Sequence, residues 1–379
     1  MATKPLSFYI HVPYCVKRCG YCDFNTYTPS ELNGDLTSVS AGYVDQLIKE
    51  STFAKSRINQ EIQTIFIGGG TPTLLDPKEL ARIITHLKEN FGFSQNIEIT
   101  IEANPDSVNS EKLEKLRGIG INRISFGMQS SVSHVLKVLD RTHNPENVAN
   151  SVTSAKAAGF DEINLDLIYG TPGESISNWK SSIDTVLSLP VSHISAYALI
   201  LEEGTKLANQ VKRGEYQVPD DAETAEKYLI ADKSFSAQGF NWYELSNWAK
   251  PGSECKHNLA YWKGDNWWGL GPGAHSHING ERFWNIKHPK SYAEALSNGS
   301  AIAGSEILSV EEMESERIML EIRLPSGIEK ASLKSAQIEK LTEFLEGGEL
   351  NPDSWREGRI ALTPNGRLVA DRIVRKILF

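Results

Sequence analysis

The first 240 residues alternate short apolar, β-branched runs with longer amphipathic stretches. The short runs predict β-strands, because buried strands of ordinary length have this composition. They are SFYIHV, TIFIGG, EITIEAN, RISFGMQ, EINLDLIYG and HISAYAL. The amphipathic stretches predict helices over residues 41–55, 77–90, 110–117, 145–158 and 175–187. Strands and helices in alternation predict parallel βα units and an α/β fold, here a six-unit (β/α)6 partial TIM-type barrel.

The pattern changes near residue 240. Residues 219–238 predict one more helix, and the next stretch is rich in Trp, Gly and His. Helical patterns return from about residue 305, and residues 358–378 predict a hairpin beside a helix. We therefore expect a part-barrel over 1–240, an aromatic and glycine-rich connecting region over 241–304, and a small helical, winged-helix-like domain over 305–379.

Composition narrows the class of protein. The 379 residues are 40% hydrophobic and 23% charged, with a net charge of −9, which disfavours an extended nucleic-acid-binding surface. Long apolar runs of membrane-spanning length are missing from the sequence, and residues 1–7 are too short and polar for a signal peptide. We therefore expect a cytoplasmic protein that does not bind nucleic acid.

Polar or glycine-rich residues come at the end of every predicted strand. In a parallel barrel the carboxyl ends of the strands meet on one face, where ligands bind. A single such residue is most often a satisfied loop residue, but their shared position predicts a binding site. The residues are Tyr9, Gly68, Gly69, Gly70, Thr71, Glu102, Asn104, Gln129, Asn164, Asp166 and Tyr197.

Three of the four cysteines, Cys15, Cys19 and Cys22, follow the first predicted strand with the spacing C-x3-C-x2-C. One interpretation is a structural zinc site with His11 as fourth ligand. Zinc ligands usually come as two separated pairs, whereas these three lie on one loop. That arrangement suits an iron–sulfur cubane in which three irons are held by thiolates and the fourth is open.

The GGGTP sequence after the second predicted strand has two interpretations. It is either a tight turn or a place where the backbone closely approaches a ligand. It does not match the P-loop pattern, so phosphate binding of that kind is not supported.

These motifs together resemble the radical S-adenosylmethionine (SAM) superfamily. The resemblance implies a [4Fe-4S] cluster on the three cysteines, with SAM bound at the open iron. The segments YIHVPYCVKRCGYCDF, FIGGGTPTLL, IEANPD, NRISFGMQS, LDRTH and NLDLIYGTPGES resemble the oxygen-independent coproporphyrinogen III dehydrogenases over nearly the whole chain. This resemblance to the dehydrogenases implies a set of SAM-binding residues. They are Tyr9, Gly69, Gly70, Thr71, Glu102, Gln129, Arg141 and Asp166, with Phe24 and Ala198 as weaker candidates.

This chain differs from the dehydrogenases in two features, and both point to another branch of the same group. The dehydrogenases carry a long segment before the cluster loop and a further cysteine where this chain has Phe24. The sequence HNLAYW at residues 257–262 instead matches the H-N-x-x-Y-W signature of the HemW-type haem chaperones. Haem needs an axial ligand and a flat apolar wall. By resemblance His257 is the haem ligand, with Cys255, Tyr261 and Trp262 as weaker candidates; on pattern alone they could equally be packed core.

The resemblance therefore implies a chaperone that binds haem as cargo and passes it to acceptor proteins. Membrane respiratory enzymes are among the implied acceptors, so peripheral contact with a membrane is compatible with it, as is a homodimer. The alternative is an enzyme of porphyrin metabolism, which decarboxylates coproporphyrinogen III by radical chemistry. A third hypothesis is a zinc-stabilised binding protein without redox activity. The missing cysteine and His257 favour the chaperone, and leave radical cleavage of SAM open.

Overall fold

The computed structural model describes residues 4–379, and the first half of the chain forms the strands that the sequence predicts. Each strand is parallel to the next, and they stand side by side in chain order. They are β1 (Leu6–Val12), β2 (Ile62–Gly69), β3 (Phe93–Ala103), β4 (Arg123–Gln129), β5 (Glu162–Tyr169) and β6 (His193–Ala198).

The sheet is larger than the predicted six-unit barrel, because it has 12 strands in the order β12-β11-β10-β9-β1-β2-β3-β4-β5-β6-β8-β7. The extra strands come from the segment that we expected to be a connecting region. They are β7 (Asn241–Glu244), β8 (Asn247–Ala249), β9 (Asn266–Leu270), β10 (His275–Ile278), β11 (Glu281–Asn285) and β12 (Ile302–Ile307). Strand β9 pairs in parallel with β1, and β8 pairs antiparallel with β6, so both edges of the six strands are extended. The aromatic segment is therefore part of the sheet.

The helices between the parallel strands begin at residues with clear start signals. Asp76 and Asn144 each cap a helix whose first residue is proline, and Ser175 caps the helix that follows the one at Asn144. All the helices predicted up to residue 238 are present. The helices of this part are α1 (Leu36–Ser40), α2 (Tyr43–Arg57), α3 (Pro77–Phe91), α4 (Ser110–Gly118), α5 (Ser133–Val138), α6 (Pro145–Ala157), α7 (Ile176–Leu187), α8 (Lys206–Lys212) and α9 (Asp221–Ala237). Short 3-10 turns follow the cysteine loop, β2 and β3: η1 (Pro29–Leu32), η2 (Pro72–Leu74) and η3 (Pro105–Ser107).

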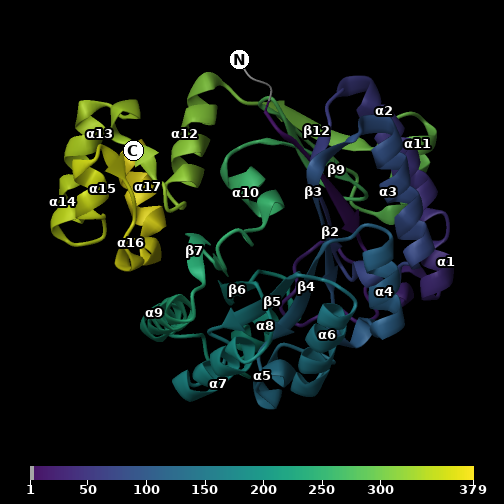
Figure 1. Cartoon of the computed structure of the whole chain (residues 1–379), viewed down its shortest axis with the longest axis horizontal. Helices are drawn as coiled ribbons and strands as arrows, with labels where there is room; N and C mark the ends of the chain where they lie inside the picture. Colours follow the sequence, from purple (N-terminus) through teal and green to yellow (C-terminus); the bar gives the residue numbers. More distant parts are fainter. Residues whose placement is uncertain (1–3) are drawn as a thin grey trace.

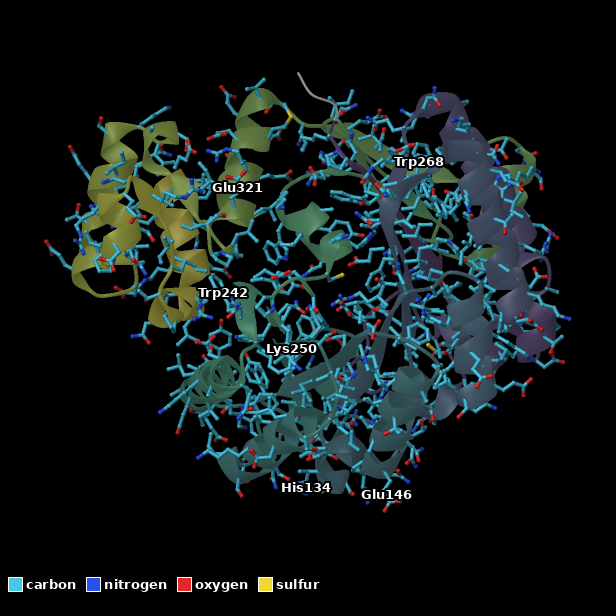
Figure 2. The ribbon with its side chains drawn as sticks, viewed as in Figure 1. His134, Glu146, Trp242, Lys250, Trp268 and Glu321 are labelled. Carbon is cyan, nitrogen blue, oxygen red and sulfur yellow. The ribbon has the colours of Figure 1, made fainter. Side chains whose placement is uncertain are left out.

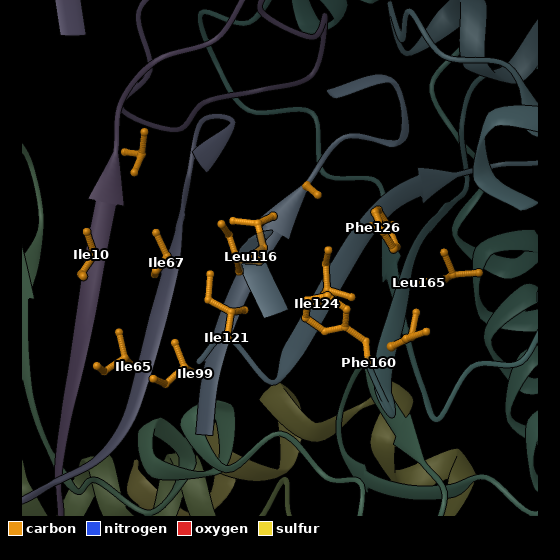
Figure 3. Packing of buried hydrophobic residues seen from close by; sticks show 14 of the residues in the cluster. Ile10, Ile65, Ile67, Ile99, Leu116, Ile121, Ile124, Phe126, Phe160 and Leu165 are labelled. Carbon is orange, nitrogen blue, oxygen red and sulfur yellow. The ribbon is translucent and has the colours of Figure 1, made fainter. Parts of the chain in front are cut away.

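The hydrophobic core lies between the strands and these helices. Alternate strand residues such as Ile65, Ile67, Ile124 and Phe126 are fully buried there (Figure 3). Because successive strand residues point to opposite faces, the residues between them face the other side of the sheet. The helices therefore cover the apolar face of the sheet, and polar residues can occupy the opposite face.

The rest of the chain adds two helices between the later strands of the sheet and six helices after its last strand. They are α10 (Lys256–Trp262), α11 (Pro289–Ser297), α12 (Val310–Glu321), α13 (Ser335–Lys340), α14 (Thr342–Glu346), α15 (Pro352–Arg356), α16 (Pro364–Leu368) and α17 (Ala370–Leu378), with a 3-10 turn η4 (Lys330–Ser332). In Figure 1, α13–α17 gather at one end of the molecule, far from α2 and α3. They enclose a second hydrophobic cluster that includes Ile322, Phe344 and Ile373.

The predicted hairpin at residues 358–378 is wrong. The only strand there among the described residues, β14 (Arg359–Ile360), pairs with β13 (Ile328–Glu329), which lies well upstream. The segment after β14 is helical instead, because Thr363 caps α16 and Pro364 begins it. The three-unit division of the chain, and the winged-helix likeness, stay predictions.

Across residues 4–379 the structure has no helix that is both long and apolar enough to cross a membrane.

Candidate functional site

The inner face of the parallel strands is polar. Alternate residues on each strand line a cavity of about 160 Å³, in contrast to the apolar residues that fill an ordinary barrel. The strand residues that line it are Tyr9, Phe66, Thr100, Glu102, Arg123, Ser125, Asn164, Asp166, His193, Ser195 and Tyr197. Three of the predicted SAM residues, Tyr9, Glu102 and Asp166, are therefore brought together by the fold.

The cysteine loop follows β1, and its two ends are held together. Tyr27 N–H donates to Pro13 O over 2.7 Å, and Cys15 N–H donates to Tyr27 O over 3.1 Å. Cys15, Cys19 and Cys22 are each partly buried on this closed loop.

A second set of contacts ties the loop to the later part of the sheet. The side-chain amide of Asn25 donates to Pro272 O (3.0 Å) and Lys287 O (2.9 Å). His11 Nε2 lies 2.8 Å from Asn25 O, and its Nδ1 lies 2.9 Å from the Tyr9 hydroxyl. His11 therefore positions the loop and has no ring nitrogen left for a metal.

Burial favours the neutral form of two of the thiols, Cys15 and Cys22. Burial raises the pKa of Cys15 to about 11, and burial also raises the pKa of Cys22. Arg141 Nη1 donates to Cys19 Sγ over 3.3 Å, and the Thr71 hydroxyl points at Cys15 Sγ from 3.9 Å. Donors of this kind stabilise thiolates once metal has displaced the protons.

The zinc interpretation loses its support here. No group of three or more His, Cys, Asp or Glu side chains within residues 4–379 stands ready to hold a metal ion. A zinc ion needs all its ligands around one point, and His11 is engaged elsewhere. A cubane takes each thiolate on a different iron, so its three sulfurs need not converge.

The GGGTP segment brings the end of β2 against the cysteine loop. Gly69 has a φ of 110°, and its N–H donates to Glu102 Oε2 over 3.0 Å. A Cβ on Gly70 would lie 2.5 Å from Tyr14 O, so a side chain there would clash with backbone. Thr71 N–H also donates to Tyr14 O over 2.8 Å. The glycines are needed because two backbone segments approach each other closely here. The neighbour is the cysteine loop, and the close approach of this backbone to a ligand stays a prediction.

Two carboxyl groups face the cavity. Burial raises the pKa of Glu102 to about 8, and the nearby charge of Asp166 adds to this shift. Burial raises the pKa of Asp166, although hydrogen bonds from Ser125 Oγ (2.7 Å) and Asn164 Nδ2 (2.7 Å) favour its ionised form. Groups that carry ammonium or hydroxyl hydrogens would find acceptors here.

The side chain of Arg141 points inward and contacts the cysteine loop. Its Nη2 donates to Asn104 Oδ1 and Gly127 O, each over 2.8 Å, in addition to its contact with Cys19. A Cβ on Gly127 would touch both Gln129 Nε2 and Arg141 Nη2, so these two side chains meet beside that glycine. Gln129 itself has a φ of 63° and is buried, which is uncommon for a residue other than glycine.

Several predicted residues do not line this cavity: Gly69, Gly70, Thr71, Gln129 and Arg141 lie near the cysteine loop, and Phe24, Ala198 and Trp262 also lie apart from it. Phe24 is 65% exposed. Ala198 and Trp262 are partly buried, but neither lines the cavity.

His257 lies at the other end of the same interior. It is the second residue of α10, which packs against β2, and its ring stacks on Phe66 with centroids 5.3 Å apart. Thr64 Oγ1 lies 2.7 Å from Nδ1, and the Tyr261 hydroxyl lies 2.9 Å from Nε2. Burial lowers the pKa of His257 to about 3, so the ring is neutral.

The tautomer of His257 follows from its partners. The hydroxyl of Thr64 donates to Ser7 Oγ over 2.8 Å, so its oxygen can only accept from the imidazole. His257 Nδ1 therefore carries the hydrogen, and the lone pair on Nε2 accepts the hydroxyl of Tyr261. Thr64 lies near the start of β2, whereas the cysteine loop follows the end of β1, so the two predicted sites are at opposite ends of the interior.

A polar network, which the sequence did not lead us to expect, lies between the cysteine-loop end and the His257 end of the interior. Arg123 is buried and contacts Ser253 O (3.0 Å). His193 lies between Asn164 Oδ1 (2.6 Å) and the Tyr243 hydroxyl (2.7 Å). The signal that could have found them is the alternation of polar and apolar residues within each strand, since RISFG and HISAY place every second residue inward.

Comparisons with known proteins agree on the class. Residues 9–186 match the Radical SAM superfamily. The curated heme chaperone HemW of Mycobacterium tuberculosis (strain CDC 1551 / Oshkosh) is 44% identical over 381 residues, covering 100% of this chain and 96% of the relative. The heme chaperone HemW of Bacillus subtilis (strain 168) is 34% identical over 379 residues, 97% of each chain.

One solved structure shares nearly the whole fold. Coproporphyrinogen III oxidase (HemN) from Escherichia coli, described as a radical SAM enzyme, aligns with a TM-score of 0.84 at 22% identity, over 99% of this chain and 90% of that one. At this identity the likeness is one of fold alone, and it identifies the α/β architecture as a radical SAM fold.

Proposed function

The chain belongs to the HemW family of radical SAM proteins, and from this premise we propose that it is a haem chaperone, which binds haem and passes it to acceptor proteins. The observation that carries the proposal is full-length similarity to curated HemW chaperones. The HNLAYW segment adds to it, because it places an imidazole and two aromatic side chains on one short helix.

We propose that Cys15, Cys19 and Cys22 hold a [4Fe-4S] cluster. The residues present fit such a group, because the loop is closed by backbone hydrogen bonds and donors reach two of the sulfurs. The cluster, when bound together with SAM, supplies one-electron chemistry at the SAM sulfonium. Arg141 would stabilise the thiolate of Cys19 through its charged hydrogen bond.

The residues proposed for SAM are those that the resemblance named. Glu102 and Asp166 present acceptors to ribose hydroxyls or an ammonium group, and Arg141 offers a cation to a carboxylate. Gly69, Gly70 and Thr71 hold the end of β2 against the cysteine loop, and Tyr9 and Gln129 complete the set. Phe24 and Ala198 remain weaker candidates, since neither lines the cavity.

For haem, we propose His257 as the axial ligand through Nε2, the nitrogen whose lone pair faces Tyr261. Thr64 then accepts from Nδ1–H, and a hydrogen bond of this kind orients a ligating imidazole and raises its basicity. Cys255, Tyr261 and Trp262 are weaker candidates. Burial raises the pKa of Cys255 to about 12, so its sulfur is a neutral thiol and a poor ligand.

The alternative function is the radical decarboxylation of coproporphyrinogen III. The fold is compatible with it, but Phe24 stands where the dehydrogenases carry a further cysteine. Complementation of a strain that lacks the anaerobic dehydrogenase, by protein shown to be folded and cluster-loaded, would move the conclusion to this function.

The cellular location and the assembly of the protein are also proposals. We infer a cytoplasmic protein that meets its acceptors, membrane respiratory enzymes among them, at the membrane surface. The division into units 1–240, 241–304 and 305–379 and a homodimer belong to the same proposal.

The test is anaerobic purification with iron, sulfide and haem measured on each variant. We expect Cys15→Ala to lose nearly all iron and sulfide, whereas Cys255→Ala keeps them. We expect His257→Ala to keep the cluster and to lose the Soret spectrum of bound haem. Haem binding by His257→Ala equal to that of the unaltered chain would overturn the assignment of the ligand. Zinc in place of iron would overturn the cluster.

A further inference from the structure

His257 is sealed inside the protein in the state that the structure describes. Its exposed fraction is 1%, and both ring nitrogens have hydrogen-bond partners. The cavity that it lines measures about 160 Å³, well below the roughly 300 Å³ at which pockets for drug-sized ligands begin. A porphyrin therefore cannot reach His257 unless α10 moves.

A single carboxylate holds the start of α10 against the sheet. Glu98, on β3, accepts hydrogen bonds from the backbone N–H of Lys256 (3.1 Å) and of His257 (2.9 Å). The thiol of Cys255 donates to the same carboxylate over 3.5 Å. Glu98 is 7% exposed, so these contacts are shielded from water and carry more energy than surface contacts.

Among the other polar contacts of α10 with the sheet, the shortest joins His257 Nδ1 to Thr64 Oγ1 (2.7 Å) and is also buried. The remaining contacts are longer. Asn258 Nδ2 reaches the Tyr243 hydroxyl at 3.2 Å and Glu244 at 3.3 Å, and Lys256 Nζ reaches Asn96 O at 3.2 Å on the exposed side. The helix has only 7 residues, and a helix of that length is not stable in water without its docking contacts.

Glycines flank α10 on both sides. Gly252 has a φ of 87° and Gly264 a φ of 60°, and a Cβ at Gly264 would meet only the flexible end of Lys4. Such residues absorb the changes in backbone angle that a hinge needs. Figure 1 shows α10 as a short separate helix joined by extended segments.

We propose that α10 is a plug latched by Glu98, and that haem reaches His257 only when the latch opens. Tyr261 lies on the same helix as His257, and in the closed state its hydroxyl donates to His257 Nε2. Haem must therefore displace this hydroxyl once the movement of α10 has exposed the ring. Glu98 is thus a positioning residue that sets how often the haem ligand becomes available. This inference rests on the proposed role of His257.

The test compares Glu98→Gln with the unaltered, cluster-loaded chain in two measurements. Loss of a charge-assisted hydrogen bond changes an equilibrium by roughly tenfold. We therefore expect haemin to bind Glu98→Gln about tenfold faster in stopped-flow absorbance. We also expect the amide hydrogens of residues 256–262 to exchange faster without haem, by a similar factor, in mass spectrometry.

The matched control is Glu50→Gln. Glu50 is likewise a buried carboxylate with several partners, among them Asn285 Nδ2 (2.6 Å) and Gly271 N–H (2.8 Å), but it does not contact α10. It should leave both rates for α10 unchanged, and so it separates the latch from general loss of stability. Glu98→Asp, which keeps the charge, should restore part of the slow rate.

The outcomes distinguish the two proposals. If the unaltered chain binds no haem, or His257→Ala binds it equally well, the proposed role of His257 fails. If haem binds through His257 but Glu98→Gln alters neither rate, or alters the exchange of α10 and not the haem rate, the latch is overturned.

Discussion

At the scale of the residue, Glu102 is a carboxyl group in the cavity whose ionised form is disfavoured by burial. Burial raises its pKa from 4.5 to about 8, and one of its oxygens accepts from Gly69 N–H. Between these two pKa values the folded protein binds more protons than the unfolded chain. Its stability therefore falls as pH rises from about 4.5 to about 8 and is level above that.

We predict that Glu102→Gln removes this pH dependence in the SAM-free protein. The variant should be more stable than the unaltered chain at pH 9, by on the order of a few kcal/mol, and similar to it near pH 5. Thermal unfolding of cluster-loaded protein at both pH values measures the difference.

The control for this prediction is Glu111→Gln. The Lys115 ammonium holds the pKa of Glu111 below its ordinary value, so this exposed acid does not titrate between pH 5 and 9. If the stability of Glu102→Gln changed with pH as steeply as that of the control, the raised pKa of Glu102 would not be the cause of the pH dependence.

At the scale of the element, the junction of β2 with the cysteine loop leaves no room for a side chain. A Cβ at Gly70 would meet Tyr14 O at 2.5 Å and Val12 O at 2.9 Å, and both are backbone atoms that cannot rotate away. The Gly70 N–H also donates to Val12 O over 2.7 Å. The end of the strand therefore holds the loop in place by contact.

We predict that Gly70→Ala destabilises the protein by about 1–3 kcal/mol and lowers its iron content, because the loop must shift. The paired variant is Gly118→Ala at the end of α4, where nothing lies within 4 Å of the added Cβ. It should stabilise the protein by about 0.5–1 kcal/mol. Denaturant unfolding and iron analysis measure both, and equal effects would argue against the clamp.

At the scale of the whole molecule, one buried cation joins the C-terminal helices to the sheet. The guanidinium of Arg367, on α16, donates to both carboxylate oxygens of Asp232, on α9, at 2.7 and 2.9 Å. It also lies 4.3 Å from the ring of Trp242. Figure 2 shows Trp242 at the junction between the C-terminal helices and the rest of the molecule.

We predict that Arg367→Ala costs about 3 kcal/mol, because it leaves the largely buried carboxylate of Asp232 without its cation, although Trp248 Nε1–H still donates to it. The C-terminal helices should then be cleaved sooner by a protease than the sheet. Arg372→Ala is the comparison, since its pair with Glu349 is largely exposed and worth about 0–1 kcal/mol. Similar unfolding and cleavage of the two variants would show that the junction does not depend on Arg367.

Local pattern was enough for much of the first half of the chain. The strand RISFGMQ has the predicted bounds, and the helix at Pro77 begins where its capping aspartate and proline indicate. The three cysteines also lie on one loop after the first strand, as their spacing in the sequence requires. Local pattern failed at residues 358–378, where the one short strand pairs with residues 328–329 and the rest is helical.

The sequence by itself determined the alternating strands and helices, the thiol loop and the family, since these depend on the spacing of neighbouring residues. Only the tertiary structure decided that β9 lies beside β1, that Arg141 turns inward to Cys19, and that His257 is buried at the far end of the interior. Local periodicity says which face of a strand or helix is apolar. It does not say which distant segment covers that face, because that depends on how the buried surfaces of the whole chain fit together.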